Sequence, residues 1–98
     1  MYDRLVEIIL NRAAELNEDL RNKIPVEEGD KAPLFGGGGV LDSIALVTLI
    51  SAVEQDVEDA FDVALTIADD RAMSASRSPF RSVGSLAEYL VTLLEESP

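Results

Sequence analysis

The sequence predicts a small all-α fold, a four-helix bundle of three main helices and one short helix, in a single domain that spans residues 1–98. In three stretches apolar residues recur at spacings that place them on one face of a helix, which is the pattern of an amphipathic helix. A chain of 98 residues is long enough for one hydrophobic core. With three Phe, two Tyr and no Trp, that core is expected to consist mostly of Leu, Ile and Val.

The first helix is predicted over residues 3–20, with Asp3 as its N-cap. Its apolar positions share one face: Val6, Ile9, Ala13, Leu16 and Leu20. Residues 21–40 contain two prolines and five glycines and show no sustained period, which indicates a long loop. The apolar members of this loop are expected to hold it against the core: Ile24, Val26, Leu34 and Phe35.

The second helix is predicted over residues 43–60, where a strand is the alternative but the length of the periodic run favours a helix. Its core face comprises Leu46, Leu49, Ile50, Val53, Val57 and Phe61. A short helix is predicted around residues 68–73, followed by an exposed loop at 74–78. The last helix is predicted over residues 85–95, with Ser85 as N-cap and Glu88 at the capping-box position. Its apolar side comprises Leu86, Tyr89, Leu90, Leu93 and Leu94.

The composition excludes several classes of chemistry. The chain has no Cys and no His, so it lacks disulfides, thiolate metal sites, the usual zinc ligands, the usual general base and every Ser-His-Asp arrangement. We therefore predict no catalytic residue and no metal site, and we do not expect an enzyme.

The charge balance restricts the partners. Nineteen acidic residues against eight basic ones give a net charge of −11, which disfavours nucleic acid and anionic membrane surfaces. A charged partner is expected to present a basic patch. The first helix carries Asp3, Glu7 and Glu15 within its apolar pattern, so neither a signal peptide nor a membrane span is predicted there, and a cytoplasmic location is the default expectation.

The stretch GGGGVLDSIALV, residues 36–47, places four glycines and Asp42-Ser43 before an apolar helix. One interpretation is a helix cap, because Asp and Ser are favoured at that position. A phosphate-binding loop would need Gly-Lys-Ser or Gly-Lys-Thr after the glycines, and a serine hydrolase would need a His or a nearby Lys. With nineteen acidic residues, a pair of catalytic carboxylates like that of a glycosidase is not excluded, but a small aliphatic bundle is not expected to hold a substrate cleft.

The stretch GVLDSIALVTLISAVEQDVEDAFDVAL, residues 39–65, resembles the modification segment of the acyl carrier proteins. Asp42 and Ser43 match the family's Asp-Ser pair at a helix start, and Ile44 matches the Leu or Met that follows. Further matches are Val47 and Leu49 at the next apolar positions, and Phe61 and Leu65 at the Phe-x-x-x-Ile step. The later stretch FRSVGSLAEYL is similar to the family's final segment. The resemblance spans the chain and implies an acyl-carrier-like bundle.

The resemblance implies that a phosphopantetheinyl transferase moves 4′-phosphopantetheine from coenzyme A to Ser43, and that Asp42 helps to position the segment. Acyl or aminoacyl groups then ride on the terminal thiol as thioesters, although the chain itself encodes no thiol. The implied partners are that transferase and the enzymes that load or transfer the acyl or aminoacyl group, each with a basic docking patch. The carrier itself is expected to be a monomer. The implied partner-binding residues are Ile44, Val47, Glu54, Asp56, Glu58 and Asp59.

The sequence departs from the family pattern after the serine. Typical carriers have acids two and five residues further on, whereas this chain has Ala45 and Thr48, and its acids lie toward the end of the helix. This displacement favours a specialised lipid or secondary-metabolite pathway over bulk fatty acid biosynthesis. The segment 71–82 is longer than usual and contains Arg71, Arg77 and Arg81, either as solvated charges or as a partner contact.

Two alternatives remain open at this point. Ile44 and Val47 are either core or half-core positions or part of a docking surface, since a single exposed apolar residue is normal and does not by itself indicate docking. The whole chain is either a modified carrier or an unmodified helical protein-interaction domain in which Ser43 is only a cap.

Overall fold

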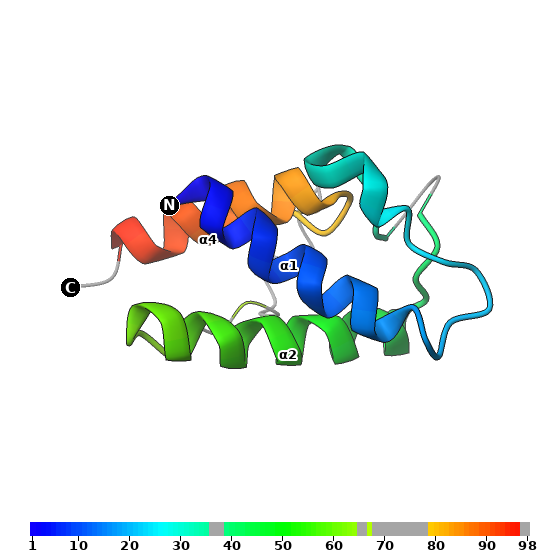
Figure 1. The fold of residues 1–98 in the computed structure, drawn as a ribbon. Coiled ribbons are helices and arrows are strands. Elements are labelled where there is room, and N and C mark those ends of the chain that lie inside the picture. Colours follow the sequence, from blue (N-terminus) through cyan, green and yellow to red (C-terminus); the bar gives the residue numbers. More distant parts are fainter. Residues whose placement is uncertain (36–38, 65–66, 68–78, 97–98) are drawn as a thin grey trace.

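The computed structural model describes residues 1–35, 39–64, 67 and 79–96. The helices are α1 (Tyr2–Leu16), the 3-10 helix η1 (Val26–Lys31), α2 (Ser43–Phe61) and α4 (Val83–Glu96). Figure 1 shows α1 running obliquely across the bundle, from beside α4 at its first residues toward the start of α2 at its end, and α1 contacts both of these helices. The helix η1 contacts α1 and α4. The described residues thus form a small all-α bundle of three main helices and one short one, which confirms the predicted fold class.

The first helix is shorter than predicted. It begins at Tyr2 and ends at Leu16, so Asp3 lies in its first turn and is not its N-cap, which is Met1. The chain turns back after the helix because the Asn17 side chain binds the backbone of Ile24 twice. Asn17 Nδ2 donates to the Ile24 carbonyl at 3.0 Å, and the Ile24 amide donates to Asn17 Oδ1 at 2.7 Å.

A 3-10 helix, η1, occupies part of the segment that was predicted to be a loop. It is fixed on two sides by tertiary contacts. The Tyr2 hydroxyl of α1 donates to Asp30 Oδ2 at 3.0 Å. On the other side Gly84 of α4 approaches the Asp30 backbone so closely that a Cβ at Gly84 would lie 2.8 Å from the Asp30 carbonyl oxygen. The close approach of α4 and η1 therefore requires glycine at position 84.

The helix α4 begins at Val83, two residues earlier than predicted. Ser82 and Ser85 cap it reciprocally, since the Ser85 amide donates to Ser82 Oγ at 3.1 Å and the Ser82 amide donates to Ser85 Oγ at 3.0 Å. The prediction of Ser85 as N-cap and Glu88 as its capping-box partner is therefore wrong. Ser85 takes the capping-box position, and Glu88 lies exposed one turn later.

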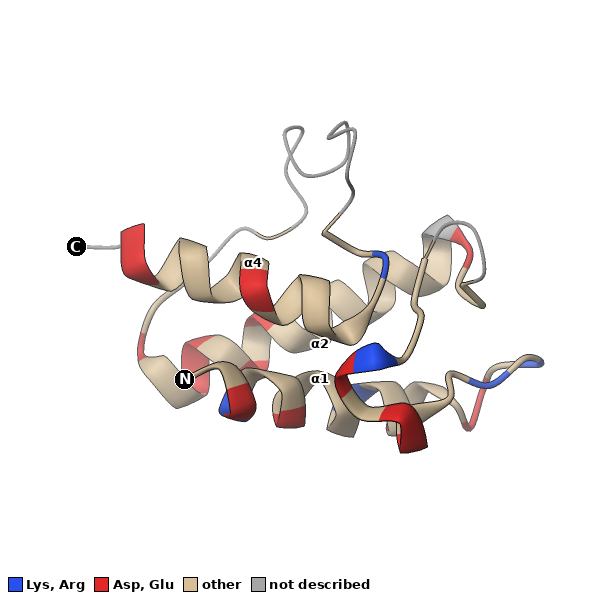
Figure 2. Cartoon of the chain, turned by 90° about the horizontal axis from the view of Figure 1, so that it is seen from above, with Lys and Arg blue, Asp and Glu red and all other residues tan. Residues whose placement is uncertain are grey.

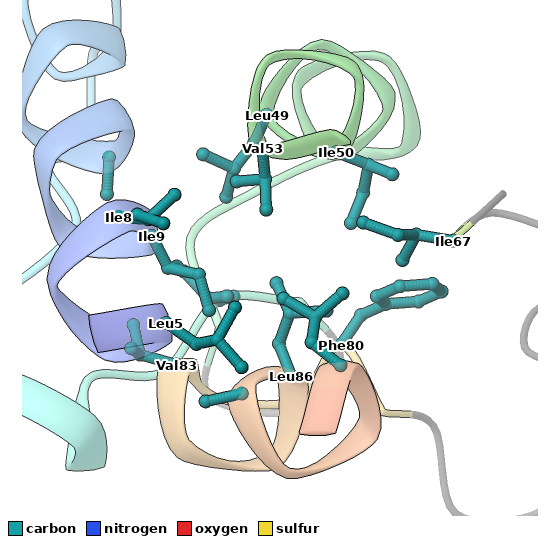
Figure 3. Packing of buried hydrophobic residues seen from close by; sticks show 14 of the residues in the cluster. Leu5, Ile8, Ile9, Leu49, Ile50, Val53, Ile67, Phe80, Val83 and Leu86 are labelled. Atoms are coloured by element: carbon teal, nitrogen blue, oxygen red, sulfur yellow. The ribbon is translucent and has the colours of Figure 1, made fainter. Parts of the chain in front are cut away.

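The core is aliphatic apart from one aromatic ring, as predicted. Its buried residues are Leu5, Ile8, Ile9, Ala13, Ile24, Ala32, Leu34, Leu41, Leu46, Leu49, Ile50, Val53, Val57, Ile67, Phe80, Val83, Leu86, Ala87 and Leu90. Figure 3 shows Ile67 and Phe80 facing each other beside Ile50 of α2. Among the predicted loop anchors, Ile24 and Leu34 are buried, while Val26 and Phe35 are partly buried against the core. The predicted helix at 68–73, the loop at 74–78, Leu65, Arg71 and Arg77 lie outside the described residues.

Candidate functional site

The start of α2 is capped by Asp42. Its backbone is extended, with φ −87° and ψ 178°, and its Oδ1 accepts a hydrogen bond from the Ala45 amide at 2.8 Å. Ser43 is the first residue of the helix. Of the pair Asp42-Ser43, Asp42 is therefore the residue that caps the helix, and Ser43 is not required as the cap.

Two backbone segments hold the chain just before this helix. The Leu41 amide donates to the Leu34 carbonyl at 3.0 Å, and Leu41 is buried. Gly39 packs so tightly against the backbone of residues 34–35 that a Cβ at Gly39 would lie 2.6 Å from the Leu34 carbonyl oxygen. The Phe35 amide in turn donates to the Phe80 carbonyl at 3.0 Å. The position of Asp42 is thus fixed through residues 34–35 to the segment that precedes α4.

Two large apolar side chains are exposed directly after Ser43. Ile44 is 80% exposed and Val47 is 50% exposed, whereas Leu46 and Leu49 on the opposite face of α2 are buried. Ile44 is therefore not a core position, and Val47, half of which is exposed, fits a half-core position. Figure 1 shows this end of α2 at the far side of the bundle from the N-terminus of the chain.

The positions that carry acids in typical carriers present no charge here. Ala45 is partly buried, and Thr48 is exposed with its hydroxyl donating to the Ile44 carbonyl at 3.0 Å. The first turn of α2 contains no acidic residue. Figure 2 shows that acidic positions elsewhere are spread over the helices of the bundle.

The four acids predicted to bind partners divide into two pairs. Glu54 accepts a hydrogen bond from the Ile67 amide at 2.9 Å, and Asp56 binds Arg12, so both already hold the fold together. Glu58 and Asp59 are exposed near the end of α2. Glu58 and Asp59 are thus the two members of the predicted set whose side chains form no hydrogen bond or ion pair outside α2 within the described residues.

The contact between Arg12 and Asp56 joins α1 to α2. Arg12 Nε lies 2.6 Å from Asp56 Oδ2, and Arg12 Nη2 lies 2.7 Å from Asp56 Oδ1, which is a two-point guanidinium–carboxylate pair. The hydrogen bond from Arg12 lowers the pKa of Asp56 below its ordinary value. Arg12 lies four residues after Ile8, at the edge of the buried face of α1.

Replacing Asp56 by asparagine is expected to remove about 1 kcal/mol from the free energy of unfolding at neutral pH, since the pair is partly solvated. Because the folded pKa of Asp56 is depressed, its contribution is complete above the unfolded pKa near pH 4 and is lost as the pH falls through the lower folded value. Urea unfolding of both proteins from neutral to acidic pH measures this, and the gap should close in acid. Glu58→Gln is the matched control, and an equal loss in that variant would contradict the assignment.

The described residues show neither a metal-binding cluster nor a membrane-spanning helix. In the described ranges, no group of three or more acidic residues is arranged to hold a metal ion. None of the helices in the part of the chain that the structure describes has both the length and the apolarity needed to cross a bilayer.

No protein-family model matches the chain, and neither a curated protein nor a solved structure is significantly similar to it. The function of the site therefore has to follow from its own residues and their geometry.

Proposed function

We propose that this protein is a carrier that receives 4′-phosphopantetheine on Ser43 and holds an acyl or aminoacyl group as a thioester on that arm. The observation that carries the proposal is the placement of the Asp42-Ser43 pair. Asp42 caps α2, and Ser43 is the first helical residue, at the end of the bundle that lies away from the N-terminus of the chain.

The start of α2 suits a phosphodiester. The first amides of a helix have no acceptor within the helix, and the helix dipole places partial positive charge there. The first turn after Asp42 contains no acid that would repel the phosphate. In the transfer, the serine oxygen forms a bond to the phosphorus next to pantetheine, the bond between the two phosphates of coenzyme A breaks, and adenosine 3′,5′-bisphosphate leaves.

The surface beside Ser43 suits a partner enzyme. Ile44 and Val47 present apolar area next to the attachment point, and Glu58 and Asp59 present negative charge further along the same helix. Acids in the last turn of a helix lie at the negative end of its dipole and weaken it by about 0.3–1 kcal/mol each. Within the described residues neither Glu58 nor Asp59 forms a hydrogen bond or ion pair with another element, and Asp59 accepts only a long hydrogen bond of 3.4 Å from Gln55 of the same helix, so their position supports a role in recognising a basic docking patch.

Incubating the protein with coenzyme A, magnesium and a broad-specificity phosphopantetheinyl transferase is expected to raise its intact mass by one phosphopantetheine. Ser43→Ala should abolish the increase, while Ser51→Ala, an exposed serine two turns along the same helix, should leave it unchanged. Mass spectrometry of the intact proteins measures both. An unchanged mass of the wild-type protein after treatment with several transferases would rule out the carrier function.

The exposure of Ile44 and Val47 favours one other function, an unmodified helical protein-interaction domain. In that case the exposed apolar pair is the docking surface, and Asp42-Ser43 serves only to start α2. The mass measurement separates the two, since an unmodified interaction domain gains no phosphopantetheine.

A further inference from the structure

A separate pocket lies between the end of η1 and the start of α4. It has a volume of about 300 Å³ and is lined by Lys31, Pro33, Arg81, Ser82 and Ser85. Two of its five lining residues are cations, although the chain as a whole carries a net charge of −11. None of the residues assigned to the carrier site lines it.

The backbone on both sides of this pocket is fixed by hydrogen bonds. The Val83 amide donates to the Ala32 carbonyl at 3.0 Å, and the Leu34 amide donates to the Arg81 carbonyl at 2.8 Å. Pro33 and Ser82 pair between them as an antiparallel bridge. The backbone at Arg81, and the segment that directly follows Lys31, are therefore held in place on the two sides of the pocket, so that only side-chain rotations are needed for both cations to reach one ligand.

The charges of these two residues are not neutralised within the described part of the chain. Arg12 pairs with Asp56, and the Lys23 ammonium donates to the carbonyls of Asn17 and Leu20 in the turn that follows α1. Lys31 and Arg81 are exposed and have no acidic partner among the described residues. Two unpaired cations that share one pocket repel each other, and an anion between them removes that repulsion.

Most of the remaining polar groups of the pocket already form hydrogen bonds within the protein, and the Ser82 hydroxyl is the donor that is still available to a ligand. The Ser85 amide binds Ser82 Oγ, the Leu86 amide binds the Ser82 carbonyl, and the Ser85 hydroxyl donates to the Pro79 carbonyl at 2.8 Å. The start of α4 is thus already capped and contributes little attraction of its own. As a donor, the Ser82 hydroxyl makes only a long contact of 3.3 Å to Ser85 Oγ, so its hydrogen can turn toward a ligand while the oxygen still accepts from the Ser85 amide.

We propose that this pocket binds a small molecule through a phosphate or carboxylate group. The Arg81 guanidinium offers two parallel N–H donors to such a group, Lys31 adds a point charge, and Ser82 adds a hydroxyl donor. The volume lies at the lower end of the range of small-molecule sites, which fits a compact ligand. Binding here is independent of modification at Ser43.

Titrating the protein with inorganic phosphate at constant ionic strength, with sodium chloride as the compensating salt, tests the proposal by amide chemical shifts. Saturable shifts are expected at Lys31, Arg81, Ser82 and Ser85. The double variant Lys31→Ala/Arg81→Ala should weaken the apparent affinity at least tenfold. Arg4→Ala/Arg21→Ala is the matched control, because it also removes two exposed positive charges but lies outside the pocket, and it should bind phosphate as the wild type does.

A parallel titration with acetate shows which anionic group the pocket prefers, since tighter binding of either anion identifies the class of ligand. The proposal is overturned if the shifts rise linearly without saturating, or if they occur equally at other cations. It is also overturned if the Lys31/Arg81 and Arg4/Arg21 variants lose affinity to the same degree. Thermal unfolding of both double variants checks that they remain folded. If one of them is unfolded, the proposal is decided by whether the shifts of the wild-type protein saturate at the pocket residues.

Discussion

Replacing Phe80 by alanine is expected to remove about 3–5 kcal/mol from the free energy of unfolding, because truncating a buried aromatic side chain leaves a large cavity. Phe80 is 1% exposed and is the only aromatic residue among the buried core residues. Its ring lies against Ile67 and near Ile50 of α2 (Figure 3). Since a small domain has a total stability of roughly 5–15 kcal/mol, this one change should bring the protein close to its unfolding threshold.

Urea unfolding followed by far-ultraviolet circular dichroism measures this loss. Phe61→Ala is the matched control, because Phe61 is the same residue type at a partly buried position at the end of α2. Its loss should be clearly smaller, in proportion to the apolar area that it buries. A loss at Phe61 that equals or exceeds the loss at Phe80 would show that the Phe80 ring does not anchor the core.

The main helices could be predicted because their apolar period is long and continuous. In α2 the period identifies Leu46, Leu49, Ile50, Val53 and Val57, and all five are buried. Phe80 could not be predicted as a core residue, since it precedes α4 in a turn where no period exists. The 3-10 helix η1 was missed for a related reason. Its residues carry no amphipathic pattern, and contacts from Tyr2 and Gly84 hold it in place.

At the candidate site, contacts between residues close in the sequence could be predicted, and contacts between distant residues could not. The cap at Asp42 is a contact with Ala45, three residues away, and the residue types alone indicate it. Asp56 and Arg12 are 44 positions apart in the sequence, so nothing in the acidic stretch of α2 shows that this carboxylate is already paired. The sequence therefore overestimates the negative surface that a partner could contact.

If Ser43 receives phosphopantetheine as proposed, replacing Gly39 by alanine is expected to slow that transfer by roughly tenfold or more, since small displacements of a reacting group have large effects on rate. The added Cβ would lie 2.6 Å from the Leu34 carbonyl oxygen and 2.8 Å from the Phe35 amide nitrogen, both of them backbone atoms. The chain must move, and Asp42 and Ser43 follow within four residues. The same strain should remove about 1–3 kcal/mol from the free energy of unfolding.

Leu90→Ala separates displacement of the attachment segment from general loss of stability. Leu90 is buried in α4, so its truncation should remove about 2–5 kcal/mol while leaving the backbone contacts before α2 in place. Initial rates of mass increase are compared at a temperature at which circular dichroism shows both variants folded. If Leu90→Ala slows the transfer as much as Gly39→Ala, stability alone controls the rate. If only Gly39→Ala slows it, the transferase requires the start of α2 in the position that residues 34–35 and 39–41 give it. Both variants keep the helix capped by Asp42, so the cap by itself would not be sufficient for rapid transfer.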